Sequence, residues 1–145
     1  MNTVNTAVDL GRSAESSEPG RNLRRWWSLI TALLVAALFL EAVFAGAMLS
    51  GAPWARKAHS VMAAVLIASS VAAGGVSMLT LRRMPHGPRL GLILLSLAAV
   101  AFLQAAVGAM TAKGANLAWV HVPLGVALVA SAAQAVAAAR RLGGD

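Results

Sequence analysis

Four long apolar segments, separated by short polar stretches, dominate the chain. They cover about residues 26–50, 54–81, 90–111 and 117–139. Each is as long as the roughly 20 apolar residues that a helix needs to cross a bilayer at about 1.5 Å rise per residue. The stretch Met84–Arg89 predicts a loop, because its two prolines lack a backbone donor and disfavour helix in the preceding residue. The pattern therefore predicts four membrane-spanning helices.

Composition supports a membrane protein of the all-α class. Hydrophobic residues make up 59% of the 145 residues and charged residues only 12%, too few charges to cover the surface of a soluble domain of this size. Residues 1–22 are polar and lack apolar periodicity, so we expect a disordered cytoplasmic tail ahead of a four-helix transmembrane domain over 23–142. The absence of cysteine excludes disulfides, zinc–thiolate sites and iron–sulfur clusters.

The basic residues indicate an orientation. A formal charge of +7 would suggest nucleic acid as a partner in a polar chain, but here the basic residues alternate between the two predicted sides of a membrane. Eight lie on one side and three on the other: Arg21, Arg24, Arg25, Arg82, Arg83, Arg89, Arg140 and Arg141 against Arg56, Lys57 and Lys113. The excess predicts a multi-pass protein of the cell membrane with both termini cytoplasmic, whose partner is the lipid bilayer and not nucleic acid.

Aromatic residues agree with these boundaries. Trp26 and Trp27 fall at the predicted inner interface, and Trp54 and Trp119 at the outer one, as in an aromatic belt. An alternative is that the first apolar segment is a cleavable signal peptide ending in small residues. The length of that segment, and the repeat described next, favour a retained helix.

The sequence contains an internal repeat with one histidine in each copy. Gly46-Ala47-Met48 recurs as Gly108-Ala109-Met110, and His59 recurs as His121, each 62 residues later. Glu41 corresponds to Gln104, one residue out of step. The repeat predicts two tandem helical hairpins that build one site at their interface.

The two histidines are the strongest candidates for a site. Each lies about five residues from the outer start of its predicted helix, so both imidazoles are expected at similar depth, facing each other inside the bundle. Two imidazoles are too few for zinc and of the wrong type for calcium or magnesium, but they suit heme iron, which needs only two axial ligands. The alternative for each histidine is a hydrogen bond to a neighbouring carbonyl.

Other residues are candidates for supporting roles. Glu41 would orient an imidazole, shuttle a proton, or bond Gln104 when protonated, and the sequence favours the last two roles. Gln104 is expected to bond between helices. Gly46 and Gly108 would let helices and a flat macrocycle approach closely, or would simply pack the helices. Arg56 would pair with heme propionates, or remain a solvated loop charge.

The pattern Leu40-Glu41-(x4)-Gly46-Ala47 leading to His59, with its echo Leu103-Gln104-(x3)-Gly108-Ala109 leading to His121, resembles a four-helix half of the heme A synthase family. The resemblance covers about residues 26–141. It implies that His59 and His121 are the axial ligands of a heme b, the metal being its iron.

Departures from that family decide which half the chain is most similar to. In the family's catalytic half, a glutamate precedes the first-hairpin histidine by three residues and an arginine follows it, whereas Arg56 and Ser60 stand there in this chain. The paired cysteines of many members are also missing. The resemblance therefore implies the half that holds heme b and passes electrons, and a homodimer would restore the eight helices of the family.

From these features we expect an integral membrane b-type heme-binding protein with bis-histidine ligation, used in electron transfer or heme handling and more readily a non-enzyme than an enzyme. One alternative is a non-enzymatic small subunit or assembly factor of a larger respiratory complex, without heme. A less favoured alternative is a heme A synthase-like enzyme that uses Glu41. A channel or transporter is disfavoured because the predicted helices carry few polar residues to line a pathway.

Overall fold

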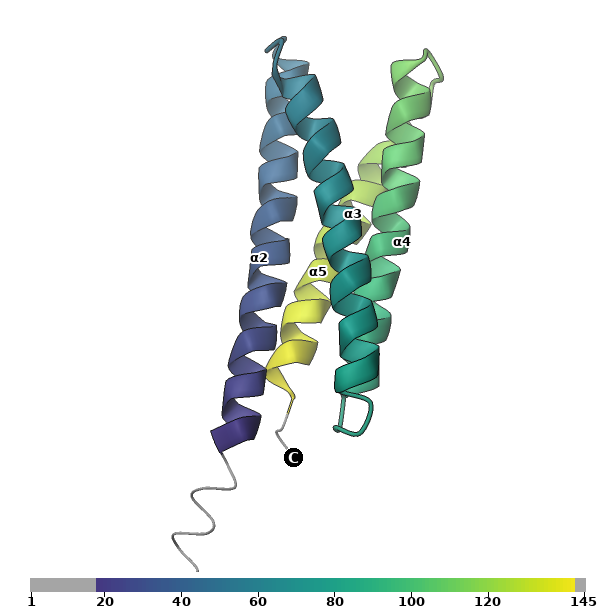
Figure 1. Cartoon of the computed structure of the whole chain (residues 1–145). Helices are drawn as coiled ribbons and strands as arrows, with labels where there is room; N and C mark the ends of the chain where they lie inside the picture. The colour runs from purple at the N-terminus through teal and green to yellow at the C-terminus, as the bar shows by residue number, and fades with distance from the viewer. Residues whose placement is uncertain (1–17, 143–145) are drawn as a thin grey trace, which may run out of the picture.

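The structure, a computed structural model that describes residues 18–142, is a bundle of four helices (Figure 1). The helices are α2 (Glu18–Leu49), α3 (Ala55–Thr80), α4 (Gly87–Ala112) and α5 (Ala118–Arg140). The shortest, α5, has 23 residues and is therefore about 35 Å long. All four are long and apolar enough to cross a membrane. The prediction of an all-α protein with four helices of this kind is confirmed.

Two helices begin earlier than the sequence pattern predicted. α2 begins at Glu18, so residues 18–22, expected in the tail, are helical; the rest of the expected tail lies outside the described residues. α4 begins at Gly87 and not near Leu90. The reason is that Pro88 occupies the first turn, where a backbone N–H has no partner within the helix and the fixed φ of proline suits helical geometry.

The helices pack in a ring in which α2 contacts α3, α3 contacts α4, α4 contacts α5, and α5 returns to α2. α3 and α5 are therefore diagonal, as are α2 and α4. We call the end that carries the α3–α4 turn the closed end, and the end that carries turns 50–54 and 113–117 the open end. Towards the open end the α2–α3 pair and α4 diverge (Figure 1).

The buried core occupies the closed end and the middle of the bundle. The cluster nearest the closed end consists of Trp27, Leu34, Leu81, Leu90, Leu94, Ala135, Ala138, Ala139 and Leu142. The middle cluster consists of Leu38, Leu66, Leu97, Ala101, Leu128 and Ala132. In contrast, Ala55 is the only buried residue within the open-end segments 39–65 and 102–127. Half of the bundle is thus packed and the other half is not.

Glycines bring α3 and α4 into close contact near the closed end. A Cβ on Gly74 would lie 2.8 Å from Cγ of Leu95, and a Cβ on Gly91 would lie 2.6 Å from Cγ of Met78. Such distances are below van der Waals contact, so a larger residue at either position would require Leu95 or Met78 to shift. Small residues of this kind allow apolar helices to associate through close packing.

The two neighbouring tryptophans of α2 differ in exposure. Trp27 is only 4% exposed and belongs to the core, whereas Trp26 is 64% exposed. Consecutive residues of a helix point about 100° apart, so the two neighbours do not share a face. Trp54 and Trp119 are exposed at the open end, and the ring of Trp54 packs edge-on against Phe44 with centroids 6.0 Å apart.

Candidate functional site

Each helix contributes one polar side chain to the interior of the open end. These are Glu41 on α2, His59 on α3, Gln104 on α4 and His121 on α5, and all four are half-buried. Glu41 lies eight residues before the last residue of α2, and Gln104 eight before the last residue of α4. His59 lies four residues after the first residue of α3, and His121 three after that of α5.

Glu41 and His59 form the contact between α2 and α3. Oε1 of Glu41 lies 3.1 Å from Nδ1 of His59, and the two side chains are 15% and 23% exposed. The distance is that of an ion pair, although its direction is not that of a hydrogen bond, since Nδ1 has no hydrogen-bond partner. A carboxylate beside Nδ1 leaves Nε2, on the far edge of the ring, as the nitrogen available to a metal.

Gln104 and His121 form the corresponding contact between α4 and α5. Nε2 of Gln104 lies 3.3 Å from Nε2 of His121. In this arrangement the amide N–H donates to an unprotonated Nε2, which places the ring proton on Nδ1. Exchanging the amide oxygen and nitrogen would instead let the ring donate to the amide oxygen. In both cases Gln104 occupies Nε2 of His121.

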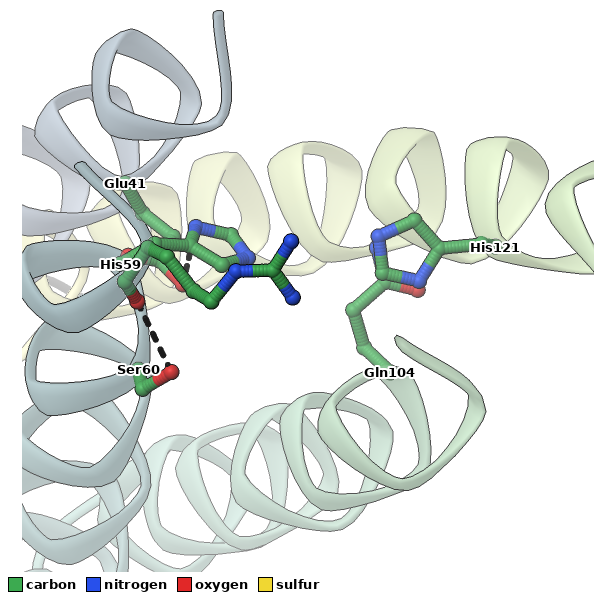
Figure 2. Close-up of polar contacts among 6 residues, drawn as sticks. Glu41, His59, Ser60, Gln104 and His121 are labelled. Carbon is green, nitrogen blue, oxygen red and sulfur yellow. Dashed lines mark hydrogen bonds and ion pairs between the residues drawn. The ribbon is translucent and has the colours of Figure 1, made fainter. Parts of the chain in front are cut away.

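The two pairs face each other across the bundle. Figure 2 shows the imidazoles of His59 and His121 pointing toward one another, with Glu41 beside the first ring and Gln104 beside the second. The expectation that both imidazoles meet inside the bundle, from diagonal helices, agrees with this arrangement.

Unsatisfied polar atoms are concentrated in this place. Five buried side-chain nitrogen or oxygen atoms in the described part of the chain lack a hydrogen-bond partner, and four belong to this site. The four are Oε2 of Glu41, Nδ1 of His59, Oε1 of Gln104 and Nδ1 of His121. The fifth is the hydroxyl of Ser70, in the packed part of α3. Buried polar groups are rarely left unpaired, so such a cluster indicates a site that receives a ligand or an ion.

Glycines surround the two pairs unequally. A Cβ on Gly108 would lie 3.1 Å from Cε1 of His121, and a Cβ on Gly125 would lie 3.4 Å from Nε2 of Gln104. A Cβ on Gly46, the repeat counterpart of Gly108, would meet nothing within 4 Å. The expected role of glycine in close approach therefore applies to His121 and not to His59.

Arg56 and Ser60 flank His59 on α3 and are exposed. The hydroxyl of Ser60 donates to the backbone oxygen of Arg56 over 2.9 Å (Figure 2). Arg56 is therefore an exposed residue of the first turn of α3, at the open end. The remaining histidine, His86, is exposed in the turn before α4 at the opposite end of the bundle, and takes no part in this site.

The donor set restricts the metals that the site could hold. The described residues contain no group of three or more His, Cys, Asp or Glu side chains that could hold a metal ion. A protein-only zinc site, which uses three or four ligands, is therefore not formed. Two imidazoles on opposite sides of the bundle interior fit a metal that brings its own equatorial ligands, and heme iron is of this kind.

Comparisons with known protein families, with curated proteins and with solved structures give no match to this chain. The arguments for function therefore depend on the site itself.

Sequence reasoning placed all four polar residues near one depth but paired one of them differently. We favoured a proton shuttle or a bond to Gln104 for Glu41, whereas the structure sets Glu41 against His59. Gln104 bonds His121, an interhelical contact as expected. Depth follows from counting residues, but the choice of partner depends on the rotation of each helix about its axis, which the apolar pattern did not resolve.

Proposed function

We propose that this protein is a multi-pass membrane protein, built from two tandem helical hairpins, that binds one heme b and serves in electron transfer or heme handling. His59 and His121 would hold its iron. Both termini lie on the cytoplasmic side, and the open end lies at the outer side of the membrane.

One observation supports this proposal above the others. Two imidazoles from diagonal helices point toward each other in the unpacked half of the bundle, where four of the five unsatisfied buried side-chain atoms are found. Apart from Nδ1 of His59, which lies 3.1 Å from Oε1 of Glu41, leaving such atoms unpaired costs about 1–3 kcal/mol each. A bundle without a ligand would gain stability by replacing them with apolar side chains, so their presence favours a bound group between the histidines.

Each residue of the site has a role in this proposal. His59 and His121 would hold the iron, and Glu41, 3.1 Å from Nδ1 of His59, would raise the basicity of that ligand. The exposed Arg56 would pair with the propionate carboxylates at the open end. The heme, when bound, supplies one-electron oxidation and reduction.

The test is an absorption spectrum of the detergent-solubilised protein, oxidised and then reduced with dithionite, with and without added hemin. We expect a Soret band and the sharp reduced bands of a low-spin bis-histidine heme. His59→Ala and His121→Ala should each abolish the bis-histidine spectrum. His86→Ala is the matched control, because His86 is exposed at the opposite end of the bundle, and should leave the spectrum unchanged.

Two results would contradict the proposal. One is a wild-type protein that shows no Soret band and gains none with hemin. The other is an unchanged bis-histidine spectrum in both His59→Ala and His121→Ala, because the iron would then have other ligands.

A further inference from the structure

The two candidate ligands are not equivalent, because their nitrogens have different partners. The partner of His59 is a carboxylate at Nδ1, 3.1 Å away, on the edge of the ring opposite Nε2. The partner of His121 is an amide 3.3 Å from Nε2 itself. The nitrogen that would bind iron is therefore left available in His59 and is occupied in His121.

Partners at these two nitrogens have opposite effects on metal binding. A carboxylate beside the ring nitrogen that does not bind the metal raises the basicity of an imidazole as a ligand. An amide bonded to the ligating nitrogen competes with the metal, because one lone pair cannot serve both. Glu41 thus supports ligation by His59, and Gln104 opposes ligation by His121.

The contact between Gln104 and His121 is closely packed but only partly satisfied. Gly125 lies under the amide, where a Cβ would be 3.4 Å from Nε2 of Gln104, and Gly108 lies under the ring of His121. Oε1 of Gln104 and Nδ1 of His121 are buried without hydrogen-bond partners. The contact between Gln104 and His121 therefore leaves two polar atoms unpaired. Moving His121 away from Gln104 costs only the one 3.3 Å hydrogen bond between them.

We propose that His59 is the fixed ligand of the site and His121 the exchangeable ligand, with Gln104 as the competing partner that holds His121 when it leaves the iron. This inference rests on the proposed heme-binding function and deepens it. Of the two histidines, His121 would be the one displaced by a small neutral ligand for ferrous iron, of which carbon monoxide is the usual probe.

The first experiment compares the two histidine variants in hemin-reconstituted protein. His121→Ala should retain heme as a species with one protein ligand, and its reduced form should bind carbon monoxide rapidly. His59→Ala should bind heme at least about tenfold more weakly than His121→Ala, because its remaining ligand is the one that Gln104 occupies. Equal heme affinity of the two variants, or weaker binding by His121→Ala, would overturn the inference.

The second experiment removes the competitor and leaves both histidines in place. Gln104→Leu cannot bond the ring, so His121 should stay on the iron and the rate of carbon monoxide binding to the reduced protein should fall by about tenfold. Gln104→Ala repeats the test with a smaller side chain. Gln134→Leu is the matched control, because Gln134 is the other glutamine of the chain and is exposed on α5.

The outcomes separate this inference from the proposed function. If the wild-type protein binds no heme, the proposed function fails and this inference fails with it. If the wild type shows a bis-histidine spectrum but both Gln104 variants bind carbon monoxide at the wild-type rate, the heme site stands and the exchangeable ligand is wrong. Helical circular dichroism of each variant confirms that the bundle is folded in every comparison.

Discussion

The closed and open ends of the bundle are made from the same four helices but differ in what lies between them. At the closed end, leucine and alanine side chains fill the interior in two contiguous clusters. At the open end, the interior holds two histidines, a glutamate and a glutamine, and a single alanine is buried. Within the open end the two copies of the repeat also differ, since Gly46 and Gly108 both precede a histidine yet only Gly108 packs against one.

This difference separates the part of the bundle that stabilises the fold from the part that carries the candidate site. In a membrane the lipid is as apolar as leucine, so helices associate through close packing and interhelical hydrogen bonds. Close packing is found at the closed end, where Gly74 and Gly91 bring α3 and α4 together. Substitutions should therefore change the stability of the fold at the closed end, and ligand binding at the open end.

The largest expected effect is on stability and compares two leucines of α4. Leu94 is fully buried at the closed end, whereas Leu103 is 53% exposed at the open end. Leu94→Ala should lower the free energy of unfolding by about 3 kcal/mol, since it leaves a cavity in a packed interior. Leu103→Ala should change it by less than about 0.5 kcal/mol. Unfolding in mixed micelles, followed by circular dichroism, measures both, and equal losses would refute the division into two ends.

A somewhat smaller effect is expected from two adjacent glycines of α3. Gly74→Ala would place a Cβ 2.8 Å from Cγ of Leu95 and 3.2 Å from its backbone nitrogen, whereas a Cβ on Gly75 meets nothing within 4 Å. Gly74→Ala should cost about 2 kcal/mol of unfolding free energy through overpacking. Gly75→Ala should be neutral or slightly stabilising in the same assay. A neutral Gly74→Ala would show that α3 and α4 are less closely packed than described.

The smallest effect concerns the open end and should appear in heme binding without a matching loss of stability. Gly108→Ala would place a Cβ 3.1 Å from the ring of His121, so the ring must shift, whereas Gly46→Ala meets nothing within 4 Å. We expect Gly108→Ala to weaken heme binding by about tenfold, a loss of roughly 1.4 kcal/mol, and Gly46→Ala to leave it unchanged. Hemin titration followed at the Soret band measures both. Equal affinities would indicate that the ring of His121 is not held by α4.

The helices of this fold could be predicted from the sequence because their ends are marked by charges, prolines and glycines. Apart from the starts of α2 and α4, the observed helix ends lie within one residue of the predicted ones. The early start of α4 has a physical reason. Proline disrupts the interior of a helix but is well accommodated in the first turn, where Pro88 lies. A proline therefore marks the neighbourhood of a helix end without fixing the residue.

The sequence predicts the depth of the site residues in the bundle, but not the direction in which each side chain points. Residue counts put Glu41, His59, Gln104 and His121 at one level of the bundle, because rise per residue is constant. The same counts could not show that Glu41 faces His59, or that Trp27 faces the core while Trp26 does not. Direction depends on the rotation of each helix, which is set by contacts such as those of Gly74 and Gly91.

The concentration of buried residues at one end has a mechanical consequence. Leu94, Leu97 and their buried neighbours are the fixed region about which the angle between the α2–α3 and α4–α5 pairs can change. A small change of tilt there becomes a larger change in the separation of α3 and α5 at the far tips, where the helices diverge (Figure 1). A flat ligand would then be bound or released at the open end while the buried residues of the closed end stay packed.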